Sequence, residues 1–146
     1  DMNKIKVLFL CVHNSARSQM AEAYLNSLGG DIFHAESAGF EPGQLNPLAV
    51  QVMKEDGIDI SNNSVDNVRD FFREKRFYGY IISVCDESKA QKCPIFPGLP
   101  KRIHWNIEDP AGLEGTQEEK LQKTRQIRDI IKEKVKEFIK EVKKSQ

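Results

Sequence analysis

The chain has 146 residues, a length typical of one domain that buries a single hydrophobic core. It carries 22 Lys and Arg against 22 Asp and Glu, and this balanced charge argues against nucleic acid as a partner. Hydrophobic residues make up 39% of the chain in short runs, which excludes a disordered protein and a span of about 20 apolar residues across a membrane. We therefore expect a cytoplasmic, monomeric protein without a signal peptide.

The first half of the chain alternates predicted strands with predicted helices. Residues 5–10 are rich in apolar and β-branched residues, which is typical of a buried strand. Apolar residues then recur at intervals of three and four over 18–28, which predicts a helix. A second strand is expected within 31–39. A second helix is expected over 46–57, because Asn followed by Pro is typical of a helix start.

The second half continues the alternation. We predict a helix over 66–76, a buried strand over 78–84 and a last strand over 102–106. Residues 86–100 contain several Pro and Gly, which favours a loop with few regular hydrogen bonds. Thr116 begins a capping-box pattern and a long amphipathic helix whose Lys and Glu form a solvated face.

This order of elements predicts an α/β fold. We expect a single domain over residues 2–146, with a four-stranded parallel sheet flanked by helices on both faces. Ligands of such sheets bind beyond the carboxyl ends of the strands. Cys11 and Cys85 each follow a predicted strand directly, so both belong to that end of the sheet.

The loop between the first strand and the first helix has the sequence CVHNSARS, from Cys11 to Ser18. Backbone N–H groups at a helix start bind tetrahedral anions, and the guanidinium of Arg17 can bind two anion oxygens. The same surroundings, with the Ser18 hydroxyl, favour the thiolate form of Cys11. We therefore predict Cys11 as the nucleophile, within an oxyanion-binding loop made of Val12, His13, Asn14, Ser15, Ala16, Arg17 and Ser18.

Three cysteines cannot form a fully paired disulfide framework, and in a reducing compartment cysteines are more often buried, metal-bound or catalytic. Cys11, Cys85 and Cys93 could therefore be small core residues. A metal site with His104 is the rival use, although the spacing of Cys85 and Cys93 is not that of common zinc motifs. His13 and His34 have no paired ligand spacing, so we interpret them as loop and strand residues.

The stretch CVHNSARSQMAE resembles the active-site loop of the low-molecular-weight protein tyrosine phosphatase fold. It is more closely similar to the thioredoxin-coupled arsenate reductases of that family. The resemblance extends to GIDIS at 57–61, to the segment from Cys85 to Cys93, and to HWNIEDPAG at 104–112. Phosphatases of this fold usually carry a second loop cysteine where Ala16 stands, and tyrosines where residues 111–112 stand, which favours the reductase branch.

The resemblance implies an arsenate reductase that acts in arsenic detoxification and receives its electrons from thioredoxin. It implies that Cys11 forms an adduct with arsenate while Asp109 acts as general acid; from spacing alone this Asp-Pro would be an ordinary turn. Cys85 would then attack Cys11 and release arsenite, and Cys93 would attack Cys85, leaving a disulfide for thioredoxin. Phosphate and sulfate would compete with arsenate, and no tightly bound cofactor is expected.

The resemblance also implies a potassium site beside the loop, formed by Asn14, Glu22, Ser37 and Asp66. Cys85 and Cys93 lie eight residues apart, so a continuous helix would separate their Cα atoms by about 12 Å, beyond the ~7 Å limit of a disulfide. We therefore expect oxidation to move residues 86–100.

Two other functions remain open from the sequence. One is a low-molecular-weight protein tyrosine phosphatase, in which water resolves the Cys11 adduct and Cys85 and Cys93 are not needed. The other is a redox-sensing or oxyanion-binding module, which needs no general acid.

Overall fold

The computed structural model describes residues 3–85 and 95–146. These residues form a four-stranded sheet in the order β2-β1-β3-β4, in which every neighbouring pair is parallel. Its strands are β1 (Ile5–Cys11), β2 (Phe33–Gly39), β3 (Tyr80–Ser83) and β4 (Lys101–His104). The prediction of an α/β fold with a four-stranded parallel sheet is confirmed.

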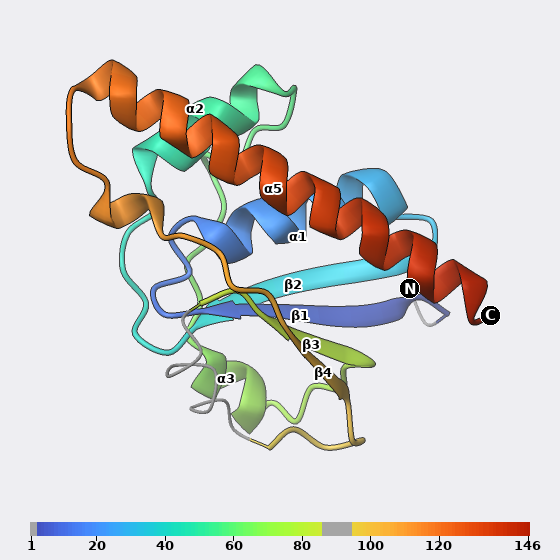
Figure 1. The fold of residues 1–146 in the computed structure, drawn as a ribbon. Helices are drawn as coiled ribbons and strands as arrows, with labels where there is room; N and C mark the ends of the chain where they lie inside the picture. The colour runs from blue at the N-terminus through green and yellow to red at the C-terminus, as the bar shows by residue number, and fades with distance from the viewer. Residues whose placement is uncertain (1–2, 86–94) are drawn as a thin grey trace.

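Helices cover both faces of the sheet, as Figure 1 shows. The helices α1 (Arg17–Gly29), α2 (Pro47–Glu55) and α5 (Gln117–Lys144) lie on one face, and α3 (Val68–Arg73) lies on the other. A short 3-10 helix, η1 (Pro110–Gly112), precedes α5. The loops that follow β1 and β2 emerge at one end of the sheet, and β3, which is parallel to β1, ends at the same side.

The alternation of side chains along β1 divides the core between these two faces. Val7, Phe9 and Cys11 are buried in a cluster with residues of α1, α2 and α5. Leu8 and Leu10 are buried in a second cluster with residues of α3. Because β1 is buried on both faces from Val7 onward, residues 7–11 form a continuous apolar run, as expected for a central parallel strand.

Several boundaries differ from the sequence predictions. The helix expected over 66–76 is shorter. Asn67 caps its start, and Lys75, with a left-handed φ of 56°, ends it. The last strand ends at His104 rather than at residue 106. The expected loop over 86–100 is irregular over 95–100, and its residues 86–94 lie outside the described part of the chain.

The last helix begins as the sequence predicts. The Thr116 side chain accepts a hydrogen bond from the Glu119 N–H, and the Glu119 carboxylate accepts one from the Thr116 N–H, which completes the capping box. Within residues 3–85 and 95–146, no helix is both long enough and apolar enough to cross a membrane.

Candidate active site

The loop after β1 surrounds the sulfur of Cys11 with hydrogen-bond partners. The Cys11 Sγ lies 2.8 Å from the Ser18 Oγ and accepts a hydrogen bond from the Asn14 N–H at 3.1 Å. The Asn14 Nδ2 donates to the same Ser18 Oγ at 2.7 Å, which directs the hydroxyl proton of Ser18 toward the sulfur. Two donors therefore point at Cys11, as a thiolate requires.

Asn14 holds the loop in shape. It is fully buried and has a φ of +53°, a left-handed conformation that asparagine tolerates better than most residues. Its side-chain oxygen accepts hydrogen bonds from the Asp66 N–H and from Gln19 Nε2. Gln19 in turn donates to the Ser64 carbonyl. The sequence analysis missed Gln19, because only the tertiary structure brings residues 64–66 beside the loop.

The N-terminus of α1 is open toward the loop. Ala16 is the N-cap residue, and among the described residues no side chain caps this helix. The backbone N–H groups of its first turn are therefore left for an anion, which is the arrangement the sequence predicts. Val12 and Ser15 are half-buried in the loop, and His13 is exposed, with its Nδ1 2.8 Å from the Glu41 carbonyl.

The end of β2 presses on the same loop. A Cβ atom added to Gly39 would lie 2.7 Å from the Val12 carbonyl oxygen and 2.8 Å from the Asn14 nitrogen. Both neighbours are backbone atoms, so they cannot turn aside as a side chain could. Glycine at position 39 therefore allows the strand and the oxyanion loop to approach closely.

Arg17 and Asp109 lie side by side at this end of the sheet although they are 92 positions apart in the chain. The buried Arg17 guanidinium lies 3.3 Å from the Asp109 carboxylate and donates to the Ile107 carbonyl at 3.0 Å. The Asp109 carboxylate also accepts from the Ala111 N–H, so it caps η1. A predicted acid is thus held beside the predicted anion-binding arginine, and it remains partly exposed.

Cys85 lies next to Cys11 through the register of the sheet. The Val84 N–H donates to the Leu10 carbonyl, and Leu10 is paired with Ser83 in parallel strands. Cys85 is therefore one residue beyond the position opposite Cys11, which corresponds to a Cα separation of about 6 Å, within the roughly 4.4–6.8 Å range of disulfides. Both thiols are buried, at 2% and 0% exposure.

Cys93 lies outside the described residues, and so does most of the segment expected to move on oxidation. His104, the ligand in the rival metal site, is hydrogen-bonded through Nδ1 to the Ser83 hydroxyl at 2.7 Å. Its Nε2 is buried and has no partner in the described part of the chain. Across residues 3–85 and 95–146, no group of three His, Cys, Asp or Glu is placed to hold a metal ion.

Three of the four predicted potassium ligands line one cavity of about 370 Å³, namely Glu22, Ser37 and Asp66. The Ser37 hydroxyl donates to the Glu22 carboxylate. Burial raises the pKa of Glu22 to about 7, and the charges of Asp66 and Glu36 add to this effect. A buried carboxylate among oxygen donors fits a hard cation, but the side-chain oxygen of Asn14 is already occupied by hydrogen bonds.

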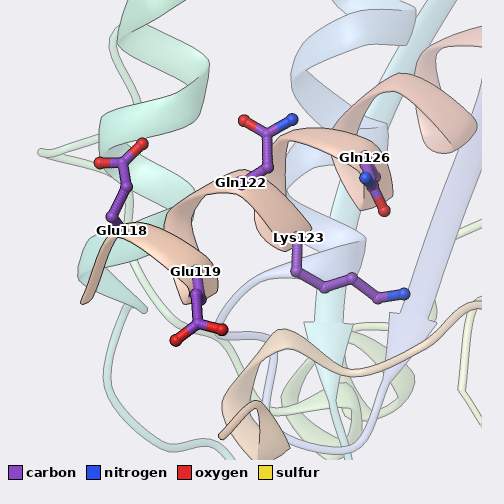
Figure 2. Close-up of a pocket in the computed structure, with 5 residues that line it drawn as sticks. All are labelled: Glu118, Glu119, Gln122, Lys123 and Gln126. Atoms are coloured by element: carbon purple, nitrogen blue, oxygen red, sulfur yellow. The ribbon is translucent and has the colours of Figure 1, made fainter. Parts of the chain in front are cut away.

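Figure 2 shows a different pocket, of about 420 Å³, along the N-terminal turns of α5. Its lining consists of Glu118, Glu119, Gln122, Lys123 and Gln126. None of the residues predicted for catalysis or anion binding lines it. We therefore place the candidate active site at the loop after β1 and not at this pocket.

Comparison with known proteins shows the family of this chain. The family described as low molecular weight phosphotyrosine protein phosphatase matches residues 6–146. A Bacillus subtilis protein named arsenate reductase is 43% identical over 136 residues, which cover 93% of this chain and 95% of the relative.

Solved structures show the same similarity in three dimensions. An arsenate reductase in a phosphate binding state has a TM-score of 0.74 at 32% identity, covering 94% of this chain and 98% of that one. A thioredoxin-dependent arsenate reductase from Corynebacterium glutamicum has a TM-score of 0.73 at 29% identity, covering 98% of this chain and 64% of that one. The chain belongs to the low molecular weight phosphotyrosine protein phosphatase family, among relatives that are named arsenate reductase.

Proposed function

We propose that this chain is a thioredoxin-dependent arsenate reductase, with residues 2–146 acting as one domain and as a monomer in the cytoplasm. The observation that carries the proposal is the position of Cys85 at the end of β3, beside the Cys11 thiol at the end of β1. Hydrolysis of a phosphoester needs only the first of these cysteines. A second buried cysteine at the end of the neighbouring parallel strand supports a two-electron reduction.

In the first step, the Cys11 thiolate attacks the arsenic of arsenate bound by the loop amides and Arg17. A sulfur–arsenic bond forms and an oxygen leaves as water, protonated by Asp109. Arg17 contacts Asp109 in the described structure, so an entering anion would draw the guanidinium onto its own oxygens and leave the acid beside the departing one. Phosphate and sulfate would compete for the same donors.

In the second step, Cys85 attacks the sulfur of Cys11. The sulfur–arsenic bond breaks, and its electron pair leaves with arsenic, which is thereby reduced from As(V) to As(III) and released as arsenite. Cys93 then attacks Cys85 and frees the Cys11 thiolate, and a thioredoxin dithiol reduces the resulting Cys85–Cys93 disulfide with two electrons. The C. glutamicum relative described as thioredoxin-dependent supports this choice of reductant.

We also propose that potassium binds in the cavity lined by Glu22, Ser37 and Asp66. The carboxylate of Glu22 is buried near Asp66 and Glu36, and although Arg76 pairs with Glu36 at 2.9 Å, a cation beside Glu22 would offset the cost of burying its charge. When bound, potassium supplies positive charge behind the loop. The residues of the chain hold the loop itself through Asn14 and Gln19.

The test follows NADPH oxidation by the reduced protein with arsenate, thioredoxin and thioredoxin reductase. We expect arsenate-dependent turnover that is lost in each of Cys11→Ser, Cys85→Ser and Cys93→Ser. Phosphoester hydrolysis that survives Cys85→Ser and Cys93→Ser, without arsenate turnover, would instead identify a phosphatase.

A further inference from the structure

Cations gather at the end of the sheet where the strands begin, which is opposite the oxyanion loop. They come from the start of β1, from the turn before β3 and from the start of β4. We term them the basic end, and they are Lys4, Lys6, Lys75, Lys101 and Arg102. The chain as a whole is neutral, with 22 Lys and Arg against 22 Asp and Glu, so this is a local excess of positive charge.

The register of the sheet places these cations close together. The Gly79 N–H donates to the Lys6 carbonyl, and the Lys101 N–H donates to the Gly79 carbonyl. The backbones of Lys6 and Lys101 are therefore about two strand spacings apart, or about 10 Å. In the described part of the chain, none of the lysines of the basic end forms an ion pair.

The C-terminal half of α5 reaches the same end of the sheet. Phe138 packs edge-on against the ring of the first residue of β3, and the last turn of α5 adds two more lysines. Acidic residues at this end include Asp31 and Glu141, while Glu74 pairs with Arg76. Positive charge therefore predominates.

Two large apolar side chains project among these cations. Phe77 is 61% exposed and Leu99 is 92% exposed, and we term them the apolar tip. Lys75 lies two positions before Phe77, and Lys101 lies two positions after Leu99. Gly98 packs against the Phe77 ring, where a Cβ atom would come within 2.8 Å, so the two segments are in contact.

The backbone holds Leu99 in solvent. Gly98 has a φ of +90° and Leu99 a φ of +51°. Phe96 fastens this segment, because it is buried and its ring packs edge-on against the ring of Tyr78. A leucine that combines a left-handed backbone with a solvated side chain is unfavourable on both counts, which is typical of a functional constraint.

Charge and area together indicate the occupant. In a symmetric dimer the basic end would face its own copy, which is repulsive. The apolar tip exposes on the order of 300 Å², taking about 200 Å² for each large side chain, and a stable protein complex buries roughly 800 Å² per partner. Nucleic acid would be stacked on aromatic rings, and Leu99 offers none. An anionic lipid surface needs only lysines near the headgroups and a few apolar side chains between them.

We propose that the basic end and the apolar tip bind the surface of a membrane that contains anionic phospholipid, with Phe77 and Leu99 inserted between the headgroups. The proposal goes beyond the proposed function and does not depend on it. Because the oxyanion loop lies at the opposite end of the parallel strands, the site around Cys11 faces away from the lipid.

The test is sedimentation of the protein with vesicles of phosphatidylglycerol and phosphatidylcholine in equal parts. We expect binding that is absent from pure phosphatidylcholine and is lost in about 1 M NaCl, which screens charges beyond about 3 Å. Each lysine near such a surface contributes about fivefold, so Lys75→Asn/Lys101→Gln should weaken binding about 25-fold. Phe77→Ser/Leu99→Asn should weaken it about tenfold. Asparagine suits the left-handed backbone at positions 75 and 99.

The matched controls are Ile130→Gln and Lys54→Gln/Lys123→Gln, which remove exposed residues of the same kinds from α5 and α2. We expect both to bind the vesicles like the parent protein. Equal binding by the parent and the variants of the basic end and apolar tip would overturn the proposal. So would a parent protein that ignores the vesicles but binds tRNA through Lys75 and Lys101, since the basic end would then serve a nucleic acid.

The orientation has its own readout, the alkylation of Cys11 by iodoacetamide in protein with Cys85 and Cys93 replaced by Ser. We expect vesicle-bound and free protein to react at the same rate. Protection of Cys11 by the vesicles would overturn the orientation.

Discussion

Ser18 shows how a single hydroxyl supports the nucleophile. Its Oγ lies 2.8 Å from the Cys11 Sγ and is oriented by the Asn14 amide. A hydrogen bond to a charged group contributes about 1.5–3 kcal/mol, so its loss should reduce the population of reactive thiolate considerably.

We therefore expect Ser18→Ala to slow the alkylation of Cys11 by iodoacetamide at neutral pH about tenfold. The rate is measured with Cys85 and Cys93 replaced by Ser, so that a single thiol reacts. Ser15→Ala is the control, because Ser15 contributes its carbonyl to the loop by accepting from the Asn46 N–H. Equal alkylation rates in all three proteins would show that the Ser18 hydroxyl does not stabilise the Cys11 thiolate.

Asp109 is the second residue whose role depends on geometry. We expect Asp109→Asn to slow arsenite release in a single turnover by about 100-fold or more, because proton donation to the leaving oxygen contributes that much. The control is Glu108→Gln, which removes the neighbouring exposed carboxylate that pairs with Lys123. If Asp109→Asn releases arsenite at the parent rate, Asp109 is only the cap of η1 and not the general acid.

At the scale of elements, β2 packs so closely against the oxyanion loop that alanine should be tolerated at Gly43 and not at Gly39. Gly39→Ala would force a Cβ into backbone atoms of Val12 and Asn14 at 2.7–2.8 Å. We expect a loss of about 1–3 kcal/mol in the free energy of unfolding and a large rise in the KM for arsenate. Gly43→Ala is the control, since its Cβ would meet its nearest neighbour, the His13 Cβ, at an ordinary 3.5 Å.

Urea unfolding and arsenate turnover measured on both glycine variants check this expectation. A Gly39→Ala protein with the stability and KM of Gly43→Ala would mean that the loop does not need the close approach of β2.

At the scale of the whole molecule, Glu22 couples the fold to pH. Its pKa is raised from 4.5 to about 7, mainly by burial, so the native state binds its proton more tightly than the unfolded state does. The stabilisation from this proton is complete below about pH 4.5 and is lost as the pH rises through 7, by up to about 3 kcal/mol.

We expect the free energy of unfolding in potassium-free buffer to fall between pH 5 and pH 8 in the parent protein. Glu22→Gln should flatten this fall, because glutamine still accepts from Ser37 and does not ionise. The exposed Glu114→Gln should leave the fall unchanged. A pH dependence that Glu22→Gln leaves intact would assign the effect to another group.

Much of the fold could be predicted because its signals are local. The apolar run of β1, the Asn46-Pro47 start of α2 and the capping box at Thr116 each depend on residues a few positions apart. The loop from Cys11 to Ser18 could be assigned as an anion site for the same reason. Helix ends were predicted less accurately. The helix α3 ends early because Lys75 adopts a left-handed conformation, which is not typical of lysine and so could not be predicted from the sequence.

The sequence by itself determined the order of the elements, the nucleophile loop and the placement of Cys11 and Cys85 after strands, since periodicity and spacing are properties of neighbouring residues. Only the tertiary structure decided that Cys85 lies beside Cys11, that Gln19 and residues 64–66 hold Asn14, and that Phe77 meets Gly98. Each of these contacts joins segments distant in the chain, and such contacts depend on strand order and register, which short-range patterns do not contain.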